Sequence, residues 1–282
     1  VSVLYISPLK ALINDMDKRI QKWCHYLGFS STKWHGDVSP HKKKCFISNP
    51  TDFLSITPES LEVILMNKST KEKKTIFSNI KYVIIDEIHY FVESDRGTQL
   101  NSLINRISKY SNNKFIKIGL SATVGNPQLV AEWLNNEKPA EIVNITSNTE
   151  SKFNVVCGDK KHITQRLYKY VNKKKILIFT QSRKEAEKYD ELLKKQLKYE
   201  KIYIHHSSID RKTREKVENN FKNEPNAFMI STSTLELGID IGNIYAVVQI
   251  KPPNTVSSNL QRMGRSGRTK DDVSRSIIFY QN

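Results

Sequence analysis

The chain has 282 residues, of which 38% are hydrophobic, and this length suits about two domains that each bury a core. Its 45 Lys and Arg against 29 Asp and Glu give a net charge of +16, which favours a polyanionic partner; the alternative is a basic surface without a specific partner. The sequence has no membrane-length apolar stretch, no signal-peptide pattern and no CxxC spacing among its 3 cysteines, so we expect no membrane partner and a reducing, cytoplasmic location.

The chain opens with a strand pattern over residues 1–7, followed by Pro8 and apolar residues at helical spacing over 9–16. This order places the first helix amides and Lys10 at the carboxyl edge of a parallel sheet, where they can meet a phosphate backbone. No cap or turn precedes the strand. We therefore expect the chain to be part of a longer one.

A polar stretch around Gly36 and a basic cluster over residues 41–44 come next, and we expect a solvated loop there. Residues 52–57 predict another strand, which turns into a helix with Thr57 as N-cap and Pro58 at its first position. Capping alone explains these residue types, and a contact with nucleic acid is an added hypothesis.

The most informative segment is 81–91, where a β-branched apolar run ends at Asp86 and Glu87. Such a run predicts a buried parallel strand, and ligands bind at the carboxyl edge of such sheets. One acid can hold Mg²⁺ through its water shell while the other orients the water that attacks a nucleotide. The alternative is that both acids only cap a following helix.

Residues 114–120 predict a strand that ends in Ser121 and Thr123, whose hydroxyls can link the acidic pair to a neighbouring domain. The pattern of strands and helices then weakens between residues 135 and 152. We place a linker near 147–151, which divides the chain into domains 1–148 and 149–282.

The second half repeats the alternation of strands and helices. Residues 175–180 predict a strand leading to a helix that Ser182 caps, with Arg183 in its first turn. The strand 202–206 ends in two histidines, which point to opposite faces and so disfavour a metal site. A strand over 227–231 leads into hydroxyls, two glycines and an aspartate over 232–242.

The last strand expected, 246–250, precedes an arginine-rich segment at 261–268. On a helix, Gln261, Arg265 and Arg268 would share one face, and two converging guanidinium groups require an anion such as a triphosphate. The alternative is a solvated basic helix.

In this order the segments resemble the signature motifs of superfamily 2 helicases. Residues 7–12 resemble motif Ia, 57–61 motif Ib, 86–89 a DExH-type motif II, 121–123 motif III, 179–183 motif IV, 232–242 motif V and 261–268 motif VI. Within the superfamily the sequence is most similar to the Lhr (large helicase-related) group, and DEAD-box RNA helicases match less well because motif II ends in His89.

One departure from the family is the absence of any Gly-x-x-x-x-Gly-Lys-[Ser/Thr] loop. This Walker A loop precedes motif Ia in the family. We therefore expect a fragment that lacks the loop and is inactive by itself.

The resemblance implies an α/β fold of two RecA-like domains with parallel sheets, the first incomplete at its N-terminus. It implies an ATP-dependent helicase that moves on and unwinds DNA or DNA-containing duplexes, with ATP and Mg²⁺ as cofactors. In that scheme Asp86 holds Mg²⁺ and Glu87 positions or deprotonates the water. Arg265 and Arg268, assisted by Gln261, neutralise the triphosphate.

Other roles are also implied by the resemblance. Gly238 and Asp240 contact the nucleotide or couple it to the bound nucleic acid. His89, Ser121 and Thr123 couple the nucleotide site to the neighbouring domain. The implied contacts with the nucleic-acid backbone are Pro8, Lys10, Thr57, Pro58, Glu59, Ser182, Arg183, His206 and Thr232.

Two further interpretations remain open. One is a RecA-like pair that binds nucleic acid or scaffolds a complex without hydrolysing ATP. The other is a nuclease that uses Asp86 and Glu87, which ranks last because the sequence shows no further acids arranged for two-metal cleavage.

Overall fold

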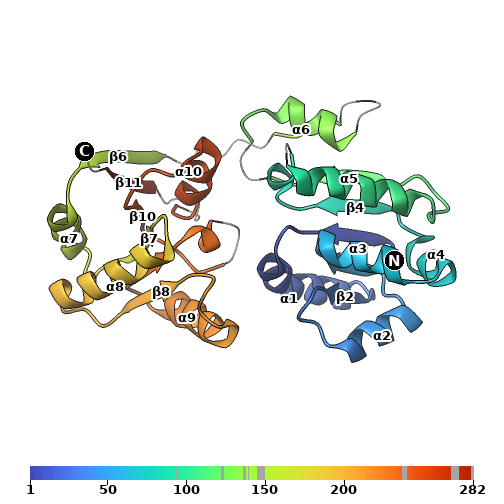
Figure 1. Ribbon diagram of the computed structural model, residues 1–282, viewed down its shortest axis with the longest axis horizontal. Coiled ribbons are helices and arrows are strands. Elements are labelled where there is room, and N and C mark those ends of the chain that lie inside the picture. Colours follow the sequence, from blue (N-terminus) through green and yellow to red (C-terminus); the bar gives the residue numbers. More distant parts are fainter. Residues whose placement is uncertain are drawn as a thin grey trace. The chain divides into compact units, whose positions relative to one another are not determined.

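The computed structural model describes residues 1–92, 94–121, 124–135, 138, 140–144, 150–236, 240–267 and 273–280. The chain divides into two compact units, Val1–Asn144 and Ile145–Asn282 (Figure 1). The predicted boundary between residues 148 and 149 falls within 145–149, outside the described residues.

In the first unit the described residues form a parallel sheet with the strand order β2-β3-β1-β4-β5. The strands are β1 (Val3–Ile6), β2 (Ser31–Trp34), β3 (Phe53–Ile56), β4 (Tyr82–Ile85) and β5 (Ile116–Gly119). The pairing of β1 sets Ile6 beside Ile56 on one side and Ile85 on the other. The carboxyl ends of the three central strands therefore lie together.

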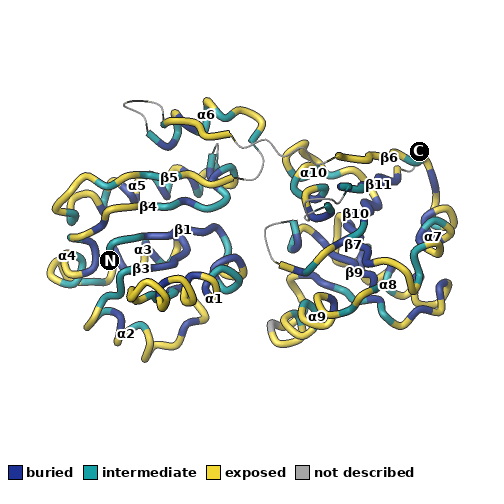
Figure 2. The backbone as a smooth tube through the Cα atoms, turned by 180° about the vertical axis from the view of Figure 1, so that it is seen from behind, coloured by how far each residue is buried: buried dark blue, intermediate teal, exposed yellow. Residues whose placement is uncertain are grey.

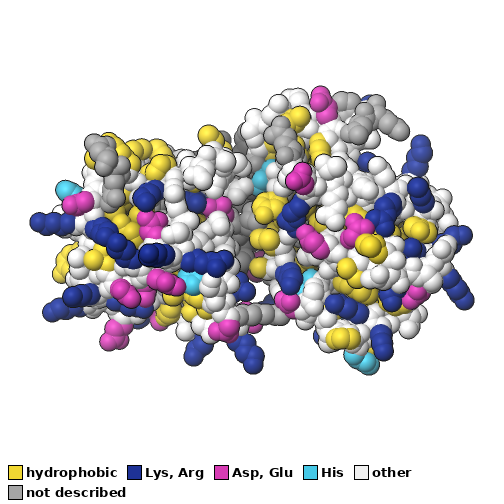
Figure 3. Space-filling view, viewed as in Figure 1, with side chains coloured by type: hydrophobic (Ala, Val, Ile, Leu, Met, Phe, Trp, Pro, Cys, Tyr) yellow, Lys and Arg dark blue, Asp and Glu magenta, His cyan; other side chains and the backbone are white. Residues whose placement is uncertain are grey.

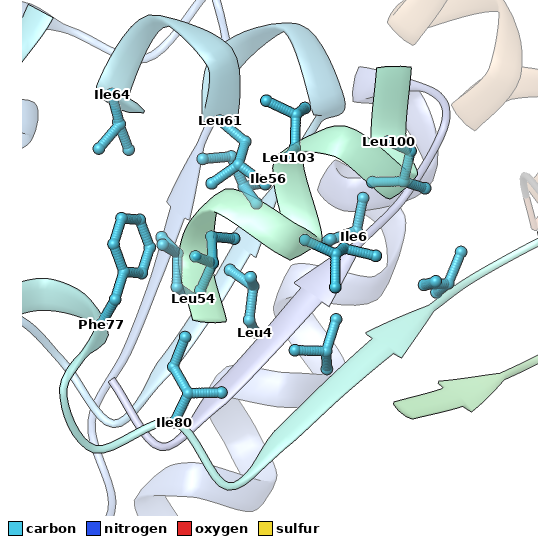
Figure 4. Close-up of a cluster of buried hydrophobic side chains, with 14 of the residues drawn as sticks. Leu4, Ile6, Leu54, Ile56, Leu61, Ile64, Phe77, Ile80, Leu100 and Leu103 are labelled. Atoms are coloured by element: carbon cyan, nitrogen blue, oxygen red, sulfur yellow. The ribbon is translucent and has the colours of Figure 1, made fainter. Parts of the chain in front are cut away.

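Helices join these strands, as parallel pairing requires. They are α1 (Lys10–Tyr26), α2 (Pro40–Ser48), α3 (Pro58–Asn67), α4 (Thr70–Phe77), α5 (Asp95–Ser108) and α6 (Pro127–Leu134). The core lies between the sheet and its helices, where Leu4 and Leu54 from the strands meet Leu61, Phe77 and Leu103 from the helices (Figure 4).

The expected solvated loop at residues 41–44 is wrong, because these residues belong to α2. Ser39 caps that helix by accepting a hydrogen bond from the Lys42 amide, and Pro40 occupies its first position. Phe46 is buried against the sheet core and anchors the helix. One cap and one apolar anchor stabilise a short helix that its lysines conceal in the sequence.

In the second unit the described residues form a parallel sheet with the order β6-β11-β10-β7-β9-β8. The strands are β6 (Ser151–Cys157), β7 (Lys175–Phe179), β8 (Ile202–His205), β9 (Ala227–Ser231), β10 (Ala246–Gln249) and β11 (Ser274–Tyr280). The helices are α7 (Lys160–Tyr168), α8 (Arg183–Leu197), α9 (Arg211–Asn223) and α10 (Val256–Met263). Strands β7 and β9 are buried throughout, whereas α9 presents an exposed face (Figure 2).

Two parts of this unit differ from the sequence-based expectation. Strand β6 begins at Ser151, where we expected the linker to end, and it pairs along its length with β11. The helix expected over 261–268 begins earlier and ends at Met263, because Thr255 caps its start and Gly264 follows its last turn. Both fold-class predictions, an α/β chain and parallel sheets, are confirmed.

Among the described residues, no helix has the length and apolarity needed to cross a bilayer. Lys and Arg side chains lie over the visible face of both units, with carboxylates between them (Figure 3).

Gly97 offers a test of the packing in the first unit. A Cβ at this position would lie 1.9 Å from the Phe91 carbonyl oxygen, so Gly97→Ala should destabilise the chain by about 2 kcal/mol in urea unfolding, despite the helix propensity of alanine. Gly125→Ala is the matched control because a Cβ there would meet nothing within 4 Å beyond its chain neighbours, and it should change stability by less than about 0.5 kcal/mol. Equal unfolding midpoints for the two variants would contradict this packing.

Candidate functional site

Asp86 is positioned by two bonds to the neighbouring strand β1. Its backbone amide donates to the Ile6 carbonyl over 2.8 Å, and its Oδ2 accepts a 2.6 Å hydrogen bond from the Tyr5 hydroxyl. Tyr5 is 3% exposed, and burial together with the Asp86 charge raises the pKa of its hydroxyl above the ordinary value. The hydroxyl therefore stays protonated and orients the carboxylate.

Glu87 has a left-handed backbone, with φ 48° and ψ 47°, which is uncommon outside glycine. The turn lets the next amide, that of Ile88, donate to the Leu120 carbonyl at the end of β5 over 2.9 Å. A short 3-10 helix, Ile88–Tyr90, follows, and the Glu87 side chain makes no capping hydrogen bond to it. The capping interpretation therefore finds no support at Glu87.

His89 connects the turn after β4 with the end of β5. Its Nδ1 forms a 2.6 Å hydrogen bond with the Ser121 hydroxyl and lies 3.6 Å from Glu87 Oε2. Burial lowers the pKa of His89, and the Asp86 charge opposes that shift only in part. A neutral imidazole therefore lies beside the acidic pair at pH 7. Thr123, predicted to act with Ser121, lies outside the described residues.

The helix N-termini predicted to contact nucleic acid are those of α1 and α3, and their side chains have different bonding partners. Lys10 begins α1, and its Nζ pairs with Asp37 Oδ1 over 2.9 Å. Thr57 precedes Pro58 at the start of α3, and its hydroxyl donates to Ser60 Oγ over 3.1 Å rather than capping the helix.

Arg96 joins these two segments, although the sequence alone predicts no role for it. Its guanidinium donates to the Pro8 carbonyl over 3.0 Å and pairs with Glu59 over 2.6 Å. It also lies over the rings of Tyr90 and Phe91. A single residue at the start of α5 thus holds the turn after β1, the start of α3 and the segment after the acidic pair.

In the second unit, the end of β7 and the end of β8 are joined by a hydrogen bond. Ser182 caps α8 by accepting from the Glu185 amide over 3.1 Å, as predicted. Arg183, the first residue of the helix, donates to Ser208 Oγ over 2.7 Å. The two predicted contact residues therefore lie at the carboxyl edge of this sheet.

The adjacent histidines do have different surroundings. His205 is 1% exposed and bonds to Thr234 over 2.8 Å and to Glu218 over 2.7 Å. His206 is buried, lies 3.5 Å from Glu187, and has a lowered pKa because of that burial. The amide of Thr232 donates to the His205 carbonyl over 3.4 Å. His206 and Thr232 therefore follow neighbouring strands at one edge.

The arginine pair that converges in the described structure is Arg262 with Arg265, and its acceptor is Glu236. Arg262 is 5% exposed, pairs with Glu236 Oε1 over 2.5 Å and lies over the Phe179 ring. The Arg265 guanidinium donates to the Glu236 carbonyl, including a 3.1 Å bond from Nε. Because α10 ends before Arg265, the expectation of one shared helix face is wrong.

The remaining predicted residues are placed as follows. Gln261 donates to Ser257 over 3.4 Å within α10. Asp240 pairs with Lys222 over 2.5 Å and accepts from the Gly242 amide over 3.0 Å. Gly238 and Arg268 lie outside the described residues.

No group of three or more His, Cys, Asp or Glu that could hold a metal occurs in the part of the chain that the structure describes. A magnesium ion held through one carboxylate, water and phosphate needs no such group.

Two protein families match this chain, one in each half. Residues 1–130 match the DEAD/DEAH box helicase family, and residues 159–270 match the helicase conserved C-terminal domain. The chain is 34% identical to the ATP-dependent helicase Lhr-Core protein 2 of Thermococcus barophilus and 34% identical to the ATP-dependent helicase Lhr-Core of Methanocaldococcus jannaschii, with 99% of this chain covered. It spans 36% and 35% of their lengths.

Solved structures show the same likeness. The structure of Mycobacterium smegmatis helicase Lhr bound to ssDNA and AMP-PNP aligns with a TM-score of 0.83 at 28% identity, covering 99% of this chain and 40% of that chain. A DEAD-box helicase bound to ssRNA aligns with a TM-score of 0.83 at 18% identity over 100% of this chain and 60% of that one, which bears on the fold alone. The predicted RecA-like fold of both units is confirmed.

The lowered pKa of His89 predicts a pH dependence of stability. Because the folded-state value lies below the ordinary 6.5, the unfolded chain binds the proton more readily, and stability falls as the pH drops below about 6.5. The thermal midpoint should therefore decrease between pH 7 and pH 5, and His89→Asn should make that decrease shallower. His25→Asn, at an exposed position of α1, is the matched control. An unchanged slope in His89→Asn would refute the assignment.

Proposed function

The chain belongs to the DEAD/DEAH-box helicases of superfamily 2 and is similar to their Lhr group, and from this premise we propose that the intact protein is a helicase that couples ATP hydrolysis to movement on and unwinding of DNA or a DNA-containing duplex. The observation that carries the proposal is the pair Asp86 and Glu87 at the carboxyl edge of β4, with Tyr5 and Ser121 bonded to the segment that holds it. One relative was solved with ssDNA and AMP-PNP.

In this proposal Asp86 helps to hold Mg²⁺. The site suits the ion because Mg²⁺ keeps several waters and takes only one or two protein carboxylates beside the nucleotide phosphates. Tyr5 occupies Oδ2 of Asp86 and so fixes the orientation of the carboxylate. The ion, when bound, neutralises charge on the phosphates.

Glu87 accepts the proton of the attacking water or orients it. The neutral imidazole of His89, between Glu87 and Ser121, then links the acidic residue to the end of β5. We assign His89 and Ser121 a coupling role on this basis, since a change at the nucleotide can reach β5 through one hydrogen bond. For Thr123, which lies outside the described residues, the same role is proposed from the family resemblance alone.

Arg265 and Arg268, with Gln261, are proposed to neutralise the triphosphate, and Gly238 and Asp240 to contact the nucleotide. Arg265 must exchange the Glu236 carbonyl for a phosphate oxygen to do so. The exchange is chemically reasonable, because a charged phosphate is a stronger acceptor for guanidinium than a neutral carbonyl.

We call the proposed binding path of a nucleic-acid strand the track, and it follows the carboxyl edge of each sheet. It comprises Pro8, Lys10, Thr57, Pro58 and Glu59 in the first unit and Ser182, Arg183, His206 and Thr232 in the second. Hydroxyls, helix-start amides and cations of this kind bind the backbone, so the affinity should tolerate changes of base sequence.

Two further parts of the proposal concern the chain itself. The sequence contains no Walker A loop, so we propose that residues 1–282 alone do not hydrolyse ATP. The three cysteines are free, which suits a reducing, intracellular location.

Glu87→Gln in the intact protein tests the enzymatic proposal. The change keeps the shape of the side chain and removes the base, so ATP binding should persist while turnover stimulated by nucleic acid falls by about 10²–10⁴-fold. Glu62→Gln is the control, since Glu62 lies on α3 and pairs with Arg106. An intact protein whose Glu87→Gln variant hydrolyses ATP at the parent rate would favour a protein that binds without this chemistry.

Arg183→Ala tests the proposed track in the 282-residue chain. If Arg183 neutralises one phosphate of a single strand, log K should fall less steeply with log salt concentration, by about 0.7 in slope. Lys195→Ala, an exposed change on the same helix, should leave the slope nearly as it was. Fluorescence anisotropy of labelled strands from 50 to 200 mM salt measures both, and equal slopes for parent and Arg183→Ala would remove Arg183 from the track.

A further inference from the structure

The second unit has a cavity at the edge of its sheet opposite to the proposed track. The cavity has a volume of about 520 Å³. Its lining includes Lys175 at the start of β7, Asn243 to Tyr245 before β10, and Val273 before β11, all at the amino ends of parallel strands. Strands of five residues separate the two edges by roughly 17 Å.

Cations dominate the lining of this cavity. Among the described residues that line it, five have basic side chains and one has a carboxylate. The basic residues are Lys173, Lys174, Lys175, Lys222 and Arg275. The carboxylate, Glu224, pairs with Lys201 over 2.7 Å, and Lys222 pairs with Asp240 over 2.5 Å. The excess positive charge of the described lining therefore comes from Lys173, Lys174, Lys175 and Arg275.

Two of these cations are held against the same aromatic ring. Lys174 Nζ and the Arg275 guanidinium each lie 4.5 Å from the centre of the Tyr245 ring. The Tyr245 amide in turn donates to the Lys175 carbonyl over 3.0 Å. Cation–ring contacts restrict side chains that would otherwise move freely. Less side-chain conformational entropy is therefore lost when an anion binds.

Lys175 brings a buried ammonium group to the cavity. It is 7% exposed, its Nζ donates to the Lys222 carbonyl over 2.9 Å, and burial lowers its pKa. Gly242 keeps this space open, because a Cβ there would lie 3.2 Å from Lys175 Nζ and its φ of +81° suits glycine. A bound anion would stabilise the charged form of Lys175.

We propose that this pocket binds phosphate groups, supplied either by the backbone of a nucleic-acid strand or by a free polyphosphate. Several fixed cations around one polar cavity suit a multiply charged phosphate chain. The assignment is independent of ATP hydrolysis and of the track at the carboxyl edge. It would give the second unit a separate contact for phosphate, without base readout.

Lysine footprinting of the 282-residue chain tests the pocket. Reactivity of Lys173, Lys174 and Lys222 toward an acetylating ester is measured by mass spectrometry, alone and with a 20-nucleotide single strand, tripolyphosphate or polyglutamate. At a ligand concentration about ten times Kd, covered lysines should react about tenfold more slowly. Lys195 and Lys216, exposed on α8 and α9, are the internal controls.

Protection by the strand alone assigns the pocket to a nucleic-acid backbone, and protection by tripolyphosphate assigns it to phosphate in either source. Equal protection by polyglutamate would overturn phosphate recognition. A strand that binds, as anisotropy reports, while neither it nor tripolyphosphate protects the lysines would overturn the pocket and leave the proposed function intact. Protection by tripolyphosphate in a chain that binds no strand would keep the pocket and count against the track.

A double variant gives an independent measurement. Lys174→Gln with Arg275→Gln should reduce the salt slope of strand binding by about 1.4, the value for two phosphate contacts. Lys195→Gln with Lys216→Gln removes the same charge elsewhere in the unit and should not. Identical slopes for the two double variants would overturn the strand as the ligand.

Discussion

The parallel pairing of β1 with β4 is the constraint on which the candidate site of the first unit depends. In this register Tyr5 lies beside Ile84, so its hydroxyl reaches the carboxylate of Asp86 two residues further along. The same pairing ends β1 at Ile6, next to Asp86, and sends Pro8 and α1 away from the same edge. A slip of one residue would turn Tyr5 to the other face of the sheet and remove the bond.

In the second unit, buried charge imposes a similar constraint. Arg262 and Glu236 are both largely buried and form an ion pair, and breaking such a pair by removing one partner costs about 3–5 kcal/mol. The two residues should therefore move together. Arg265 bonds to the carbonyl of the same Glu236, so the positions of both arginines depend on this one residue.

Much of the sheet architecture could be predicted from the sequence, because buried parallel strands are short apolar runs such as 82–85 and 227–231. Strand β6 could not, since its residues are mostly exposed and carry no such run. The ends of strands also located Asp86, Ser121, Ser182 and Thr232. What the sequence does not contain is the partner of each side chain: Tyr5, Arg96 and Glu236 meet the site through strand register and helix packing.

The distribution of charge suggests that different residues of the chain attract a nucleic-acid strand and position it. At the carboxyl edges, Ser182 and Thr232 are neutral, and Lys10 and Glu59 are each paired with an opposite charge. Residues of this kind orient a phosphate backbone but add little to the long-range field of a chain with a net charge of +16. The cations around Tyr245 contribute more to that field, because Glu224 is the one carboxylate among the described residues that line their cavity. In the proposed scheme the cations around Tyr245 add to the attraction of a polyanion, and Arg183 adds one charged contact to the residues that align it at the carboxyl edge.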